Sequence, residues 1–150
     1  MTGGWDESAT AWIASMGDRG DWGREFVIDG PMLAEARALN PATAIDVGCG
    51  EGRFCRMLKE HGVAATGVDP TGALIDEARR RDPSGDYRLG RAEALEFGDA
   101  AFDLAVSYLS LIDIEHADKA IAEMARVLRP GGSLLIAHVN AFTTAAEPNA

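Results

Sequence analysis

Three closely spaced glycines, Gly48, Gly50 and Gly52, follow a short apolar run and are the first feature that suggests chemistry. Glycine lets the backbone turn sharply and lets a ligand approach the amide groups at the start of the following helix. Asp69 stands about twenty residues further on, where a carboxylate can accept hydrogen bonds from ribose hydroxyls. These features predict a nucleotide-containing ligand. A dinucleotide fingerprint has its third glycine where Arg53 stands, so the spacing disfavours NAD.

The sequence around this glycine turn alternates between apolar runs and amphipathic stretches, which is typical of repeated strand and helix units. Such alternation predicts a parallel sheet with helices on both faces, which is an α/β fold. Ligands bind beyond the carboxyl ends of the strands, where the strand order reverses. The loops after the first, second and fourth strands should therefore surround one crevice. The predicted strands are residues 44–47, 63–68, 87–89, 102–108 and 133–139.

The residues before the first strand predict two helices that pack on the core or cover its ligand. Trp5, Trp12 and Met16 recur at helical spacing, and Pro31 suits the first turn of a second helix. The glycine-rich, charged stretch 17–23 predicts a loop between them that is able to close over a ligand. We therefore divide this single domain into a helical lid or packing segment (1–40), a core (41–139) and a tail (140–150).

Five segments in the expected order resemble the motifs of class I S-adenosylmethionine (SAM) dependent methyltransferases. The resemblance is strongest to the ubiquinone-biosynthesis-like group, which methylates small molecules. It implies a Rossmann-like, doubly wound parallel sheet of strand order 3-2-1-4-5, and methyl transfer to an oxygen, nitrogen or carbon nucleophile, with S-adenosylhomocysteine as product. The matching segments are AIDVGCGEGRF (44–54), GVDP (67–70), GRAEAL (90–95), FDLAVS (102–107) and RVLRPGG (126–132).

The same resemblance assigns parts of the cofactor to residues of this chain. It implies Asp46, Gly48 and Gly50 at the amino-acid end of SAM, Asp69 on the ribose, and Pro70, Ala92 and Glu93 around the adenine, with Ser107 and Leu109 near the sulfonium and the acceptor. Arg91 stands where the family commonly has an aspartate that receives the adenine amino group, and arginine cannot accept a hydrogen bond. Either Glu93 substitutes for that aspartate or cofactor affinity is reduced.

No catalytic residue is assigned, because in-line transfer from a positively charged sulfur depends mainly on alignment and exclusion of water. Asp113 and His116 are candidate general bases, although both also suit the start of the helix that follows. Arg24 is a candidate partner of the SAM carboxylate or an ordinary solvated arginine. Trp5, Trp12 and Trp22 are either packing residues or platforms for the substrate, and Cys49 and Cys55 are expected to be packing residues.

Composition narrows the choice of partners. The net charge is −10, and the basic residues gather only at Arg79, Arg80 and Arg81, so a nucleic-acid partner is not expected. No apolar run has the length of a membrane span, and no metal-ligand spacing is present. Without a secretory signal, the two cysteines predict a reducing, cytoplasmic location.

Family members usually continue past the fifth strand with a helix and an antiparallel strand pair, whereas eleven residues follow Val139 here. We expect those strands to be missing. The chain is then a fragment, a homodimer paired through the edge of strand five, or a fold whose N-terminal helices cross the open edge. Two further functions stay open: a SAM-binding module that is non-catalytic or completed by a partner, and a nucleotide-dependent oxidoreductase domain.

Overall fold

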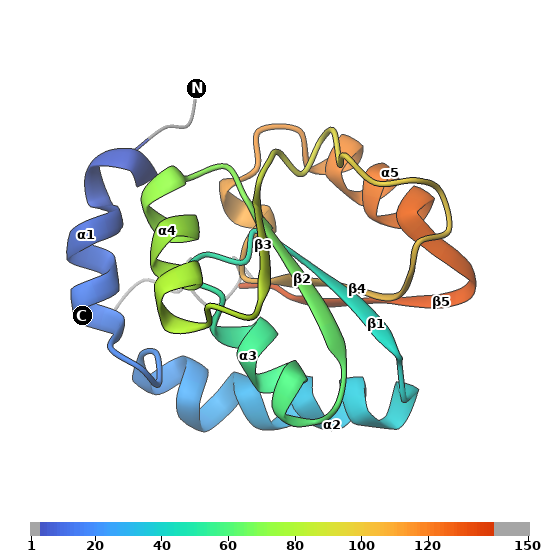
Figure 1. Cartoon of the computed structure of the whole chain (residues 1–150), viewed down its shortest axis with the longest axis horizontal. Helices are drawn as coiled ribbons and strands as arrows, with labels where there is room; N and C mark the ends of the chain where they lie inside the picture. Colours follow the sequence, from blue (N-terminus) through green and yellow to red (C-terminus); the bar gives the residue numbers. More distant parts are fainter. Residues whose placement is uncertain (1–3, 140–150) are drawn as a thin grey trace, which may run out of the picture.

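The core is one parallel sheet of five strands in the order β3-β2-β1-β4-β5 (Figure 1). This confirms the α/β fold and the strand order expected from the sequence. The computed structural model describes residues 4–139, so the tail expected at 140–150 lies outside the described part of the chain. The strands are β1 (Thr43–Val47), β2 (Ala64–Asp69), β3 (Asp86–Leu89), β4 (Phe102–Tyr108) and β5 (Leu128–Ala137).

Helices cover both faces of this sheet because the central strands are apolar on both sides. On one face, Ile45 and Val47 of β1 pack with Met124 of α5 (Ala117–Val127). On the other, Ala44 packs with residues of α2 (Asp29–Leu39) and α3 (Arg53–Glu60). The crossover helix α4 (Gly72–Arg81) packs beside α3 through Ile75 and Ala78.

The N-terminal segment is helical over most of its length. Helix α1 (Trp5–Met16) lies against α4 at one end of the molecule (Figure 1). The loop expected over 17–23 is shorter than predicted, because helical backbone resumes at Trp22 and continues through the π-helical turn η1 (Arg24–Ile28) into α2. Helix α2 ends at Leu39, because the left-handed backbone of Asn40 (φ 47°) stops it before Pro41.

The sequence expectation for the start of β5 was wrong. β5 begins at Leu128 rather than Ser133, because Leu128 already pairs with Phe102 before a bulge shifts the register to Leu104 opposite Ser133.

β5 is the edge of the sheet, and no strand among residues 4–139 pairs with its outer side. Helix α2 packs on the face of the sheet near β5, through contacts to Leu135 and Ala137, and does not cover the edge of that strand. Ile136 is 40% exposed. Within residues 4–139, the outer edge of β5 therefore has no strand partner.

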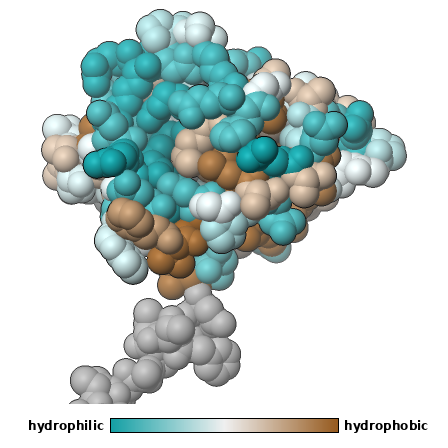
Figure 2. All heavy atoms as spheres, turned by 90° about the horizontal axis from the view of Figure 1, so that it is seen from below, coloured by the Kyte–Doolittle hydropathy of each residue, from teal (hydrophilic) through white to brown (hydrophobic). Residues whose placement is uncertain are grey.

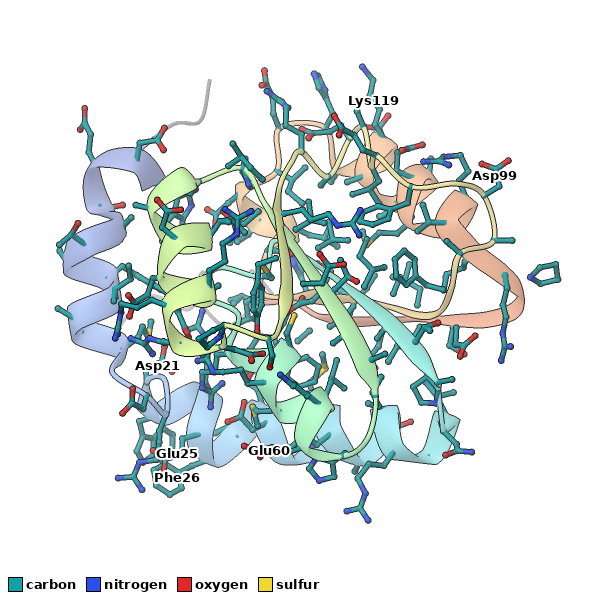
Figure 3. The ribbon with its side chains drawn as sticks, viewed as in Figure 1. Asp21, Glu25, Phe26, Glu60, Asp99 and Lys119 are labelled. Carbon is teal, nitrogen blue, oxygen red and sulfur yellow. The ribbon has the colours of Figure 1, made fainter. Side chains whose placement is uncertain are left out.

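Seen from below, the surface is mostly hydrophilic with separate apolar patches (Figure 2). One exposed aromatic pair is formed by Trp22 and Phe26, whose ring centroids are 5.8 Å apart. Phe26 projects outward beside Glu25, and charged side chains such as Lys119 and Asp99 project from the opposite end of the molecule (Figure 3). The pair at Trp22 thus belongs to the surface.

Candidate functional site

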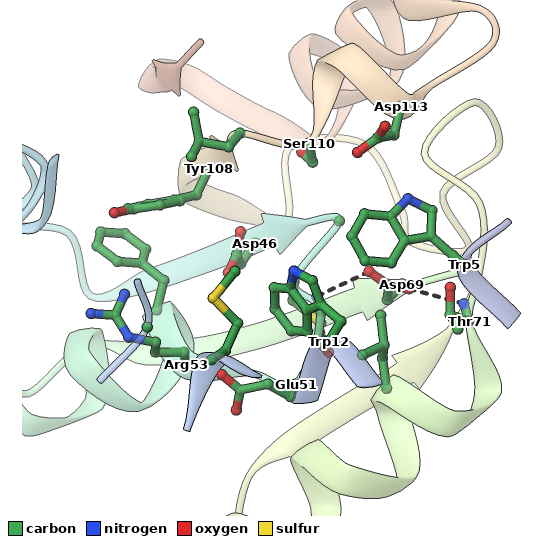
Figure 4. A pocket seen from close by; sticks show the side chains of 18 of the residues that line it. Trp5, Trp12, Asp46, Glu51, Arg53, Asp69, Thr71, Tyr108, Ser110 and Asp113 are labelled. Carbon is green, nitrogen blue, oxygen red and sulfur yellow. Dashed lines mark hydrogen bonds between the residues drawn. The ribbon is translucent and has the colours of Figure 1, made fainter. Parts of the chain in front are cut away.

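A pocket of about 160 Å³ opens at the carboxyl ends of β1, β2 and β4, where the strand order reverses (Figure 4). Loops from all three strands line it, as the sequence predicts for the crevice of a doubly wound sheet. Of the residues assigned from the sequence, the following line this pocket: Asp46, Gly48, Gly50, Asp69, Pro70 and Leu109.

The glycine loop after β1 is held by its neighbours on both sides. The amides of Gly48 and Cys49 donate to the carbonyl of Val68 over 2.8 and 3.0 Å. Gly48 has a left-handed backbone (φ 78°), and a Cβ atom there would lie 2.3 Å from the Cβ of Ser110. Ser110 in turn donates to the carbonyl of Val47 over 2.6 Å. Only glycine fits at position 48 with Ser110 in this place.

Asp69 lies at the end of β2 with its carboxylate directed across the pocket (Figure 4). The amides of Gly50 and Thr71 each donate to one of its oxygens over 2.9 Å. Burial raises the pKa of this carboxyl, and the two amide donors oppose that rise. A carboxylate has about four acceptor positions, so two remain for a ligand.

Asp46 is the buried carboxyl at the floor of the pocket. Its Oδ1 atom has no hydrogen-bond partner among the residues that the structure describes, whereas its Oδ2 accepts a weak bond of 3.7 Å from the thiol of Cys55. Burial, followed by the nearby charges of Asp69 and Glu51, raises the pKa of Asp46 to about 7. An unpaired acceptor in such a place suits a cationic or hydrogen-bond-donating ligand group.

A second pocket of about 470 Å³ adjoins the first and shares Gly48, Pro70 and Trp5 with it. Ala92 and Glu93, the residues assigned to the adenine edge, line this second pocket. Arg91, the departure from the family pattern, lines it too and forms an ion pair of 3.2 Å with Glu93. Glu93 is thus held by Arg91 at the wall of this pocket.

The loop after β4 places only some of the predicted residues at the site. Leu109 lines the first pocket with a left-handed backbone (φ 56°). Ser107 is completely buried and lines neither pocket, although its hydroxyl lies 2.8 Å from that of Ser110, which lines the first. Asp113 lines both pockets, whereas His116 only precedes α5 and lines neither.

Helix α1 covers the glycine loop with aromatic side chains. Trp5 and Trp12 meet edge to face with their ring centroids 5.7 Å apart, and both line the first pocket (Figure 4). The ring of Trp12 lies 3.6 Å from the position of a Cβ on Gly50. Of the three tryptophans, Trp22 lines neither pocket and is 70% exposed. Trp5 and Trp12 therefore belong to the site, and Trp22 belongs to the surface.

Sequence reasoning missed a polar network at the other end of the pocket. Arg53 pairs through two nitrogens with the buried carboxylate of Asp29, and the hydroxyl of Tyr108 donates to the same carboxylate over 2.8 Å. Arg53, which stands where a dinucleotide fingerprint has its third glycine, turns its side chain toward Asp29. Arg24 also lines the pocket and pairs with Asp21. Burial, followed by the bond to Asp29, raises the pKa of Tyr108, so the phenol stays protonated.

Neither a metal-binding group of side chains nor a membrane-spanning helix is found among residues 4–139. Within this range, no group of three histidine, cysteine, aspartate or glutamate side chains is arranged to hold a metal ion. None of the helices formed by these residues combines the length and the apolar character that crossing a bilayer requires.

One protein-family model and several individual proteins resemble this chain in sequence. Residues 45–136 match the family model described as "Methyltransferase domain". The chain is 40% identical over 91 residues to malonyl-[acyl-carrier protein] O-methyltransferase of Serratia marcescens, covering 61% of this chain and 36% of the relative. It is 31% identical over 125 residues to demethylmenaquinone methyltransferase of Renibacterium salmoninarum, covering 83% of this chain and 50% of the relative. The chain thus spans half or less of these relatives.

A solved structure shares the fold. The SAM-dependent methyltransferase of Thermotoga maritima, described as a possible histamine N-methyltransferase, superposes with a TM-score of 0.71. The two sequences are 23% identical, and the match covers 88% of this chain and 58% of the other. At this level of identity the likeness supports the fold alone.

Proposed function

Since this chain belongs to the methyltransferase domain family, within the class I SAM-dependent methyltransferases, we propose that it binds SAM and transfers its methyl group to a small molecule. The observation that carries the proposal is the pair of pocket-lining carboxyls, Asp46 and Asp69, at the ends of adjacent strands. Both retain acceptor positions that no described residue fills.

We assign the parts of the cofactor to the two connected pockets. The amino-acid end lies by Asp46 and the glycine loop, where an ammonium group would supply the donor that the Oδ1 atom lacks. The ribose lies at Asp69, and the adenine lies beside Pro70 in the second pocket with Ala92 and Glu93. The sulfonium lies near Leu109, and Ser107 acts there only through Ser110.

The chain's own residues supply alignment and a dry environment. SAM, when bound, supplies a methyl group that positive sulfur has already activated. Trp5, Trp12 and Met16 of α1 cover the pocket, and excluding water strengthens every polar contact beneath them. Asp113 is the acidic group at the junction of both pockets and is our candidate to take a proton from the acceptor.

The acceptor that this pocket favours has an apolar or aromatic body. Aromatic and aliphatic side chains dominate the wall around the end of β4, with Phe54 and Tyr108 at 5.1 Å between ring centroids. Two of the matched relatives are named for malonyl-[acyl-carrier protein] and for demethylmenaquinone. Malonyl-[acyl-carrier protein] and a demethylmenaquinone analogue are therefore the first acceptors to assay for S-adenosylhomocysteine formation. Saturable cofactor binding without turnover of any acceptor would favour a binding module completed by a partner.

Calorimetric titration tests the cofactor site. Wild type should bind SAM and S-adenosylhomocysteine, and NADH serves as the control ligand. Asp69→Ala should weaken SAM binding by about 10- to 100-fold, the usual cost of losing hydrogen bonds to a charged group. Asp76→Ala, which changes an aspartate with an 81% exposed side chain on α4, should bind like wild type. A folded wild type that binds neither ligand would overturn the proposal, and unchanged affinity in Asp69→Ala would overturn the ribose assignment.

We also propose that two copies pair through the open edge of β5 and that the protein works in the cytoplasm. The edge of β5 pairs with no strand among residues 4–139, and Ile136 on it is half-exposed, which supports the first point. The free thiols of Cys49 and Cys55 support the second. Light scattering after size exclusion should show a dimer that Ile136→Lys converts to a monomer. A monomeric wild type would contradict the pairing.

A further inference from the structure

The glycine loop carries a buried charge that the cofactor assignments do not use. Glu51 has 1% of its side chain exposed and lies below Trp12 (Figure 4). A buried carboxylate is costly unless cations and donors surround it. Arg56 donates to its Oε2 atom over 2.6 Å and to its backbone carbonyl over 2.6 Å. A second guanidinium, that of Arg81, lies 3.4 Å from the same Oε2 atom.

Arg81 connects three parts of the fold through one nearly buried side chain, which is 12% exposed. It is bonded to Glu77 of its own helix α4 over 2.6 Å. Its Nη1 atom, which faces Glu51, also donates to the carbonyl of Gly17 over 2.8 Å. Gly17 directly follows Met16, the last residue of α1. One guanidinium thus joins α4, the glycine loop and the end of the helix that covers the pocket.

We propose that Arg81 is a positioning residue that fastens the lid helix α1 to the glycine loop. Helix α1 packs mainly against α4 (Figure 1), and the hydrogen bond from Arg81 to Gly17 joins its C-terminal end to the guanidinium that faces Glu51. Trp12 and Met16 lie on the last two turns of α1, next to this attachment. Given the proposed function, release of the attachment opens the lid over bound cofactor and speeds its dissociation.

Arg80 provides a matched control. It pairs with the same Glu77 as Arg81 does, over 2.7 Å, but its side chain is 71% exposed. No contact joins it to Glu51 or to the end of α1 among the described residues. The substitutions Arg81→Gln and Arg80→Gln therefore remove the same charge from α4, and only the first removes the attachment.

The test begins without any ligand. In a Trp22→Phe background, Trp5 and Trp12 are the only tryptophans, so acrylamide quenching reports the exposure of α1. Arg81→Gln should raise the quenching constant about twofold by local opening of the helix, and Arg80→Gln should leave it unchanged. Arg81→Lys should also raise the quenching constant, because a lysine ammonium cannot bind the Gly17 carbonyl and the carboxylates of Glu51 and Glu77 together. Melting temperatures confirm that each variant is folded.

Stopped-flow dissociation of S-adenosylhomocysteine then tests the consequence for the site. Arg81→Gln should release it about tenfold faster than Arg80→Gln, as expected for a lost charged hydrogen bond. Wild-type quenching in both folded Arg81 variants would overturn the attachment, and equal release rates in Arg81→Gln and Arg80→Gln would overturn its effect on cofactor release. If wild type bound no cofactor, the proposed function would fail, while the quenching experiment would still decide whether Arg81 holds α1.

Discussion

Replacing Asp46 with asparagine should remove a pH dependence from the stability of the fold. The folded protein holds the pKa of Asp46 at about 7, chiefly through burial, whereas the ordinary value is 3.8. Between these two values the folded state keeps a proton that the unfolded state has released. The free energy of unfolding therefore falls as the pH rises through this range, and it levels off above the folded pKa.

The magnitude follows from the size of this shift. One pKa unit corresponds to about 1.4 kcal/mol, so the roughly two units between pH 5 and the folded pKa make wild type lose about 3 kcal/mol between about pH 5 and pH 8. The asparagine side chain of the variant cannot ionise, so the variant should not show this loss. Any constant penalty from burying the amide group is the same at both pH values and does not enter the comparison.

Urea unfolding of both proteins at about pH 5 and pH 8, followed by circular dichroism, measures this difference. Other titrating groups are common to both proteins and cancel. Wild type should lose stability relative to Asp46→Asn as the pH rises. Parallel behaviour of the two proteins would refute the reasoning, and would mean that Asp46 is ionised and solvated throughout. Calorimetry with two buffers of different ionisation enthalpy should also show proton release when SAM binds beside Asp46.

Three further predictions concern the surroundings of the site. Gly52→Ala should lower the free energy of unfolding by about 2 kcal/mol or more in thermal denaturation, because its Cβ would lie 2.4 Å from the ring of Tyr87 and its backbone is left-handed. Gly98→Ala is the control and should lower it little, because no atom lies near a Cβ at that position. Arg126→Ala should speed amide hydrogen exchange in the loop before β4, since Arg126 donates to two carbonyls there, and unchanged exchange would contradict this role. Trp22→Phe should keep the change in tryptophan fluorescence on cofactor binding, because the two tryptophans of α1 report that change. If the change disappeared in this variant, the signal would come from Trp22 at the surface.

The sheet and its glycine loop were predictable from local sequence because each rests on short patterns. β1 is buried on both faces, so it is a continuous apolar run interrupted only by Asp46. The position of Asp69 at the end of β2 followed from its distance to the glycines. The start of β5 was not predictable, because Pro130 and the glycines beside it conceal a bulge that pairing with β4 sustains.

The walls of the site depend on contacts between distant residues, and no local pattern reports them. Asp29, Arg53 and Tyr108 belong to three elements and meet only because α2 and α3 pack on the same face of the sheet. Trp5 and Trp12 have the spacing of an ordinary amphipathic helix, and only the packing of α1 on α4 brings them to the pocket. Their assignment as packing or site residues could not be made from spacing alone.

The contact between Gly48 and Ser110 limits how this site can change its substrate. The loop after β4 is where an altered acceptor preference would most directly be introduced, yet the Cβ of Ser110 occupies the space that a side chain at position 48 would need. A larger residue at 110 has to displace the turn that is assigned to the amino-acid end of the cofactor. Diversification of this loop should therefore concentrate at Leu109 and Ile114, which line the pocket, and a randomised library should recover only small residues at 110 among variants that still fold.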